Sequence, residues 1–322
     1  MTRVYDDDLN SGFGTRAIHA GQRPEPLAGA IMTPVYLTST YVQEGLGKHK
    51  GYEYARGKNP TREALERNVA ALEGGRHGFA FASGTACIDS ISKLFRAGDH
   101  IICGENVYGG TFRLFDKVAK VWGLDHSPAP VADTGAVAAA IEPGRTKLVW
   151  VETPTNPMLT IGDIEALATV AHDAGALLVV DNTFATPYLQ NPLDLGADIV
   201  MHSVTKYLGG HSDLLAGFVA CSKPKLSEKI RFIQNSSGAV LGPWDCWLSI
   251  RGIETLELRM ERHCSNAAKI AGYLEAHPLV DQVYYPGLTT HKNHDIARVQ
   301  QNNLFGGVVP FSLKEDTEEN AT

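Results

Sequence analysis

Short apolar runs alternate with amphipathic segments through the middle of the chain, from about residue 79 to residue 221. The runs are FAFAS, HIICG, KLVWVE, ALLVVDN, DIVMHS and GFVACS, and helical patterns such as TACIDSISKLFRAG, TFRLFDKVAKVWG and IEALATVAHDAG stand between them. This rhythm predicts an α/β domain around a mostly parallel sheet. Because KLVWVE and ALLVVDN are almost continuously apolar, we expect helices on both faces of these strands and ligands at their carboxyl ends.

The segments on either side of this core lack the regular alternation of apolar runs and helical patterns. Residues 1–50 are expected to form an extended arm, residues 51–250 the large domain and residues 251–322 a partial α+β domain. In the large domain, Asn59-Pro60 caps a helix that stops at Gly74-Gly75.

The last part of the chain begins with a long helical stretch from Trp244 to about His277. A strand in QVYY, a helix near His294 and a strand in GGVVPFSL follow, and this small domain is expected to leave a strand with an open edge. The acidic tail 314–322 is expected to be solvated and disordered.

Composition and charge exclude several classes of partner. The 322 residues are 43% hydrophobic and carry a formal net charge of -7, and their basic residues are scattered, so neither nucleic acid nor an anionic membrane surface is an expected partner. The N-terminus is acidic and no apolar run approaches membrane-spanning length, which favours a cytoplasmic protein. The five cysteines are widely spaced without a Cys-x-x-Cys pair, so we expect buried, reduced thiols.

A lysine and an aspartate follow two of the buried strands. Lys206, in the segment SVTK after DIVMHS, is expected at a strand's carboxyl end, where desolvation favours the neutral amine that attacks an aldehyde. Asp181 ends ALLVVD and reaches the same edge if the two strands are neighbours, where a carboxylate keeps a pyridine nitrogen protonated. Taken alone, an aspartate that caps a turn and a surface lysine are the better interpretation.

The turn Ser83-Gly84-Thr85-Ala86 joins the strand FAFAS to a helix. Its backbone N–H groups and hydroxyls suit a phosphate at a helix N-terminus, although such turns are also ordinary caps. Together with Lys206 and Asp181, it predicts a pyridoxal-phosphate (PLP) site.

Two other patterns carry less weight. Gly12-x-Gly14-x-x-Ala17 matches a dinucleotide fingerprint but follows the polar segment DDDLNS instead of a strand. His291-x-x-His294 lacks a nearby third ligand, so a metal site is not expected.

Ten sequence blocks then resemble one enzyme family. They are FGTRAIHAGQ, YEYARGKNPT, FASGTA, VYGGTFR, VETPTNP, VVDNTF, SVTKYLGGHSD, QNSSGAV, RGIETLELRM and YPGL. From about Phe13 to Leu313 the chain is similar to the cystathionine gamma-synthase, cystathionine gamma-lyase and methionine gamma-lyase family of PLP enzymes, and it looks closest to the cystathionine gamma-lyases. This resemblance implies the type I, aspartate aminotransferase-like fold and a tetramer of two active dimers.

The resemblance also implies roles for individual residues. It makes Lys206 the Schiff-base lysine and catalytic base, assisted by Tyr108, and it places Asp181 at the pyridine nitrogen. By this resemblance Gly84, Thr85, Ser203 and Thr205, beside Ser83, bind the phosphate of the cofactor. Tyr108 stacks on the cofactor ring, and Asn156 lies near its phenolic oxygen. Tyr54 and Arg56 reach the phosphate in a neighbouring subunit, and Arg113 binds the distal carboxylate of the substrate.

The activity that the resemblance implies is gamma-elimination of cystathionine to cysteine, 2-oxobutanoate and ammonia, a step of transsulfuration and cysteine biosynthesis. Gamma-replacement, as in cystathionine gamma-synthase, is the enzymatic alternative. Family members continue beyond Leu313 and supply an arginine for the substrate α-carboxylate, so a third expectation is a truncated, catalytically impaired subunit.

Overall fold

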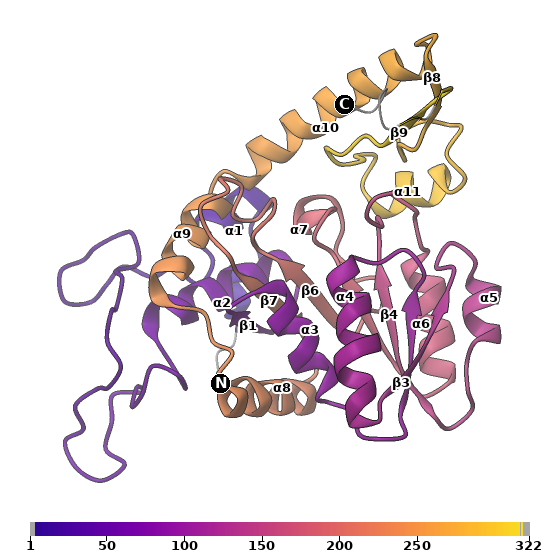
Figure 1. Ribbon diagram of the computed structural model, residues 1–322. Helices are drawn as coiled ribbons and strands as arrows, with labels where there is room; N and C mark the ends of the chain where they lie inside the picture. Colours follow the sequence, from indigo (N-terminus) through magenta and orange to yellow (C-terminus); the bar gives the residue numbers. More distant parts are fainter. Residues whose placement is uncertain (1–3, 316, 318–322) are drawn as a thin grey trace.

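A seven-stranded sheet forms the centre of the protein (Figure 1), for which the computed structural model describes residues 4–315 and residue 317. The strand order is β1-β7-β6-β5-β4-β2-β3. Only β7 runs opposite to the other six strands, which confirms the expected α/β fold with a mostly parallel sheet. The strands are β1 (His77–Phe81), β2 (His100–Gly104), β3 (Asp125–Ala129), β4 (Thr146–Glu152), β5 (Leu177–Asp181), β6 (Ile199–Ser203) and β7 (Gly217–Cys221).

Helices cover both faces of this sheet, as the continuous apolar strands require. One face packs against α3 (Gly84–Ser92), the π-helical turn Leu114–Val118 after α4 (Gly109–Arg113), and α8 (Pro224–Ser237). The other face packs against α2 (Pro60–Leu72), α5 (Thr134–Ala139), α6 (Ile164–Asp173) and α9 (Pro243–Ile253). A short helix, α7 (Thr186–Leu189), follows β5.

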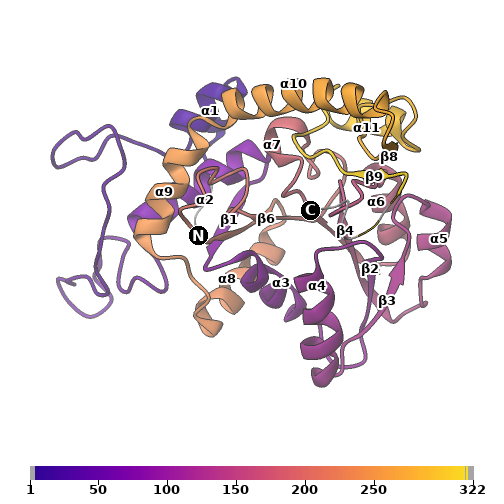
Figure 2. The ribbon, with the colours of Figure 1, turned by 45° about the horizontal axis from the view of Figure 1, so that its top comes forward.

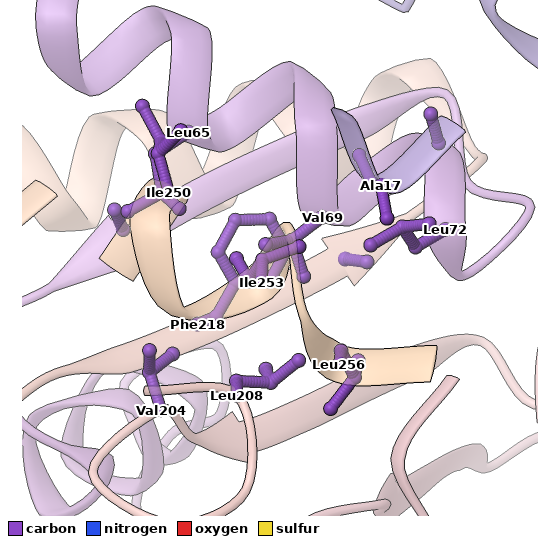
Figure 3. Close-up of a cluster of buried hydrophobic side chains, with 14 of the residues drawn as sticks. Ala17, Leu65, Val69, Leu72, Val204, Leu208, Phe218, Ile250, Ile253 and Leu256 are labelled. Carbon is purple, nitrogen blue, oxygen red and sulfur yellow. The ribbon is translucent and has the colours of Figure 1, made fainter. Parts of the chain in front are cut away.

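The second face contains a buried cluster that also holds the turn after β6. Phe218 of β7 lies among side chains of α2 and α9, including Val69 and Ile253 (Figure 3). Val204 and Leu208, which flank Lys206 in the sequence, belong to the same cluster and are fully buried. Hydrophobic burial on either side therefore fixes the segment that carries the lysine.

The start of α2 matches its sequence signal. The Oδ1 atom of Asn59 accepts hydrogen bonds from the N–H groups of Thr61 (3.0 Å) and Arg62 (3.3 Å), and Pro60 occupies the first helical position. The Nδ2 atom of Asn59 donates to the carbonyl of Tyr36 at 2.9 Å. This one amide side chain thus caps the helix and ties the preceding segment to it.

Strand β3 and the helices α5, α7 and α8 of the large domain were absent from the sequence prediction. Strand β3 is a partly exposed edge strand of sequence DHSPA, and an edge position with proline and polar residues gives no apolar run. Helix α5 is only six residues long. The predicted helix TFRLFDKVAKVWG is divided into α4, the π-helical turn and a 3-10 helix at Ala119–Trp122.

The C-terminal part is a small unit beyond a long helix. The predicted helical stretch after Trp244 breaks at Thr255 into α9 and α10 (Leu256–Glu275), and α10 leads to β8 (Val280–Val283), α11 (His294–Gln300) and β9 (Phe311–Leu313) (Figure 2). The expected strand is not alone, because β8 pairs antiparallel with β9, but each strand of this two-stranded sheet keeps an open edge, as expected. Most of the tail for which disorder was predicted lies outside the described residues.

The N-terminal region is less uniform than an extended arm. Helix α1 (Phe13–His19) packs on α2, where the Nδ2 atom of Asn68 donates to the carbonyls of Arg16, Ala17 and Ala20, each at 3.1 Å. Residues 20–58 form turns and loops that reach away from the large domain (Figures 1 and 2).

All five cysteines are free and buried, which confirms the expectation of reduced core thiols. Within the described part of the chain, no helix combines the length and the apolar character needed to cross a bilayer.

The cap of α2 can be tested by substitution. We expect Asn59→Ala to lower the free energy of unfolding by about 1–2 kcal/mol, because it leaves buried helix N–H groups without an acceptor. Asn59→Ser retains an oxygen that can cap the helix and loses the bonds of Nδ2 to the carbonyl of Tyr36 and the hydroxyl of Tyr41, so it should cost less. Urea unfolding of the three proteins measures the difference, and equal stability of Asn59→Ala and the wild type would contradict the assignment.

Candidate active site

A cavity opens at the carboxyl ends of the central strands. It brings together all the predicted cofactor residues except Tyr54 and Arg56. Its lining consists of Ser83, Gly84, Thr85, Ile88, Tyr108, Glu152, Asn156, Asp181, Thr183, Phe184, Met201, Ser203, Thr205, Lys206 and Leu215. These residues come from turns and strand ends separated by more than a hundred positions, as parallel topology allows.

The turn after β6 presents Lys206 to this cavity. Its backbone is held by the buried side chains of Val204 and Leu208 and by Arg259 of α10, whose Nη1 atom donates to the carbonyl of Tyr207 at 2.7 Å. Lys206 itself is exposed, so this chain does not give it the burial that was expected. The reason is geometric, because the anchoring residues point into the core and the lysine points to the open side.

Asp181 is the buried acid of the cavity. It pairs in register with Glu152 on β4 and with Met201 on β6 and is 6% exposed. The N–H and the hydroxyl of Thr183 both donate to its Oδ1 atom, and no donor from the described residues reaches Oδ2. Burial raises the pKa of Asp181 in spite of the hydrogen bonds from Thr183.

Hydroxyls and a helix N-terminus gather at another part of the cavity. Ser83 caps α3, with its Oγ atom accepting from the N–H of Ala86 at 3.1 Å. A Cβ atom on Gly84 would lie 3.2 Å from the Cβ of Ser203, so a side chain at this position would crowd the approach between α3 and β6. The hydroxyl of Thr205 bonds to the carbonyl and N–H of Ala216, at 3.3 and 3.2 Å.

The donor set of the cavity fits PLP. A free carboxylate oxygen on Asp181 suits a protonated ring nitrogen, and the hydroxyls of Ser83, Thr85 and Ser203 at a helix N-terminus suit a phosphate. The amine of Lys206 supplies the group that condenses with an aldehyde. Each chemical part of the cofactor thus has a matching group in one cavity.

The sequence interpretation assigned no role to Glu152, although it lies in the cavity and is 6% exposed. Burial and the nearby charge of Asp181 raise the pKa of Glu152 to about 8. A signal was present, because KLVWVE ends in an acid as ALLVVD does, and neighbouring parallel strands place such ends together.

Three predicted site residues lie elsewhere. Tyr54 and Arg56 line a separate cavity beside α8, where the Nη1 atom of Arg56 donates to the carbonyl of Asn235 at 2.6 Å. Arg113 is exposed at the end of α4 and does not line the cavity of Lys206. Within one chain, the geometry therefore does not connect these arginines with the lysine.

The two histidines of the pattern His291-x-x-His294 have other contacts. The Nδ1 atom of His294 lies 2.8 Å from the carbonyl oxygen of Pro286, and its ring stacks on Phe305. Among residues 4–315 and 317, no group of three or more histidine, cysteine or acidic side chains is arranged to hold a metal ion.

Comparison with known proteins agrees with the chemistry of the cavity. The family model described as "Cys/Met metabolism PLP-dependent enzyme" matches residues 14–322. The chain belongs to this family. The family is defined by PLP dependence, so PLP is the cofactor of this enzyme class, and the resemblance seen in the sequence blocks is confirmed.

Individual relatives carry different activities in their names. The chain is 51% identical over 310 residues to a "Probable cystathionine gamma-synthase" of Herpetosiphon aurantiacus, covering 96% of this chain and 97% of that protein. It is 49% identical over 316 residues to a cystathionine beta-lyase of Coxiella burnetii, covering 98% and 81%. The structure of cystathionine gamma-lyase from Lactobacillus plantarum complexed with L-serine matches with a TM-score of 0.92 and 49% identity, covering 95% and 79%.

The two buried carboxyls predict a pH dependence of stability. Both Asp181 and Glu152 hold their protons above the ordinary pKa values of 3.8 and 4.5. As the pH rises from about 4 to about 8, the folded state binds more protons than the unfolded state, so the free energy of unfolding falls. Asp181→Asn removes one carboxyl and its repulsion on the other, and we expect a smaller fall.

Urea unfolding of the cofactor-free protein at several pH values measures this difference. Glu165→Gln, which changes an exposed carboxyl on α6, is the matched control and should keep the wild-type profile. Identical pH profiles of Asp181→Asn and the wild type would show that Asp181 ionises as an ordinary carboxyl.

Proposed function

We propose that this chain is a PLP-dependent transsulfuration enzyme whose cofactor is bound at Lys206. The observation that carries the proposal is the single cavity in which Lys206, the buried carboxyl of Asp181 and the hydroxyls at the start of α3 meet. Membership of the Cys/Met metabolism family supports the same chemistry. The lysine, the acid and the phosphate cradle each supply one part of a cofactor site.

When bound, PLP supplies an electron sink that stabilises negative charge at the substrate Cα. Asp181 holds a proton on the ring nitrogen with its free Oδ2 atom, which favours that sink. Lys206 would hold the aldehyde carbon of the cofactor covalently and, as a free amine, would remove the Cα proton of the substrate as general base. Tyr108 provides the stacking ring, and Asn156 provides a side-chain amide for the phenolic oxygen.

For the reaction itself, we propose gamma-elimination of cystathionine. Lys206 would take the proton from Cα and, once its amine has returned that proton to the cofactor-bound substrate, would accept a second proton from Cβ with assistance from Tyr108. The Cγ–S bond breaks with its electron pair on sulfur, which leaves as the thiolate of cysteine and is protonated. Hydrolysis of the remaining four-carbon unit yields 2-oxobutanoate and ammonia.

Two related reactions use the same first proton transfer. The relative from Herpetosiphon aurantiacus bears the name of a gamma-synthase, and the relative from Coxiella burnetii that of a beta-lyase, at nearly equal identity. A gamma-synthase joins cysteine to an activated homoserine, and a beta-lyase breaks the Cβ–S bond of cystathionine. Because the proposed roles of Lys206 and Asp181 serve all three reactions, the products distinguish them.

The lysine can be tested by its absorbance. We expect the purified protein with PLP to show a band near the edge of the visible range that Lys206→Ala abolishes, together with a fall in kcat of about 10²–10⁴-fold or more through loss of the general base. Lys229→Ala, an exposed lysine of α8, is the control and should retain both. If Lys206→Ala keeps the band, the cofactor is linked elsewhere.

Product analysis tests the finer proposal. With cystathionine as substrate, we expect 2-oxobutanoate and cysteine in equal amounts. Pyruvate and homocysteine instead would assign beta-elimination. No turnover of cystathionine, but its formation from cysteine and an activated homoserine, would assign gamma-replacement.

Tyr54 and Arg56 enter the proposal only through a second subunit. We propose that they reach the phosphate of a neighbouring copy, since they line a cavity separate from Lys206 in their own chain. Mixing inactive Lys206→Ala and Arg56→Ala proteins under exchange conditions should then restore activity, because each mixed dimer contains one intact site. If mixing restores none, Arg56 does not act across subunits.

A further inference from the structure

Glu152 ends β4 directly beside Asp181, and its side chain lines the cavity of Lys206. A second buried acid next to Asp181 is unfavourable, because burial and the neighbouring negative charge both oppose its ionisation. Neither the general base nor the pyridine partner in the proposed mechanism requires it. Its contacts indicate what compensates this cost.

The two carboxylate oxygens of Glu152 accept hydrogen bonds from two different loops. The Oε2 atom accepts from the N–H of Tyr108 at 2.7 Å, in the segment that follows β2 and begins α4. The Oε1 atom accepts from the N–H of Asn156 at 2.9 Å, in the segment that follows β4. One side chain therefore joins the two loops that carry the proposed stacking ring and the proposed amide contact.

These contacts depend on the ionised form. A carboxylate offers acceptors on both oxygens, whereas a protonated carboxyl or an amide presents a donor on one side. That donor would face one of the two N–H groups, so one loop would lose its bond. The side chain of Tyr108 is itself half-exposed, at 51%, so its backbone bond is an important restraint on the ring.

We propose that Glu152 is a positioning residue of the active site, which holds the loops of Tyr108 and Asn156 in place through its two carboxylate oxygens. This inference rests on the proposed cofactor site at Lys206. Glu152 acts through the two loops and leaves the proton transfers to Lys206.

Amide hydrogen exchange of the cofactor-free protein, measured above the raised pKa of about 8 so that Glu152 is ionised, is the first test. In Glu152→Gln, exchange at Tyr108, Asn156 or both should be about fivefold faster than in the wild type, since one hydrogen bond to a buried carboxylate is lost. Amides of β1, an edge strand separated from β4 by three other strands, should keep their rates. Glu105→Gln is the matched control, because it removes an exposed acid from the same loop as Tyr108.

The loaded protein gives a second readout. Visible circular dichroism per bound cofactor reports the asymmetry of the ring's surroundings, and we expect it to change in Glu152→Gln but not in Glu105→Gln. We also expect kcat to fall about tenfold with a smaller change in KM, because misplaced groups reduce turnover more than binding. A residue needed only for stability would lower the melting temperature and leave the dichroism per bound cofactor unchanged.

The outcomes separate this inference from the proposed function. If the wild type shows the Lys206-dependent band and Glu152→Gln matches it in exchange and dichroism, the positioning role is overturned and the cofactor site stands. If the wild type lacks the band, the cofactor site fails, and with it this role of Glu152. Should Glu152→Gln not fold, exchange in the wild type decides, because rapid exchange of both amides contradicts the proposal.

Discussion

The parallel pairing of β4, β5 and β6 is the constraint on which the active site depends. It sets Glu152 opposite Asp181 and Asp181 opposite Met201, so that three strand ends meet at one edge. Because side chains alternate along a strand, a slip of one residue in β5 would turn Asp181 out of the cavity and present Asn182 instead. Register, set by the apolar faces of these strands, therefore decides which chemistry reaches the cavity.

A buried polar network on the other face holds the same strand ends. The Nδ2 atom of Asn182 donates to Glu73 at 2.8 Å, and Glu73 also bonds to His202 of β6. The Nε2 atom of Gln190 donates to Asn182 at 2.9 Å. Breaking any of these bonds would leave a buried polar group without that partner, so they favour one arrangement of β5 and β6 over nearby alternatives. These hydrogen bonds on the opposite face thus help to fix the positions of Asp181 and Ser203 on the cavity side.

Much of this arrangement could be predicted from the sequence because its signals are local and strong. Continuous apolar runs locate the buried strands, and their ends locate Asp181 and the turn of Lys206. Edge strand β3 could not be predicted, since a strand with one free edge and a proline needs no apolar run. The exposure of Lys206 could not be predicted from the sequence either, because it follows from the way Val204 and Leu208 point into the core.

The contacts of the arginines could not be predicted from the sequence either. A sequence block marks Arg56 and Arg113 as candidates, but long side chains on loops and helix ends take their partners from tertiary structure. In this chain Arg56 bonds to the carbonyl of Asn235 on α8, and Arg113 is exposed. Residues at strand ends are fixed by the sheet, whereas these are fixed by whichever surface lies against them.

The distribution of polarity in the cavity gives the remaining argument for its ligand. Two acids, Asp181 and Glu152, occupy the strand ends, and the hydroxyls and N-terminus of α3 occupy another part. A ligand that is cationic at one end and anionic at the other would relieve the repulsion between the acids and complement the positive end of the helix. A protonated pyridine that carries a phosphate has this polarity. The raised pKa values of the two acids in the cofactor-free protein are therefore understandable as part of a binding site for which the ligand supplies the missing positive charge.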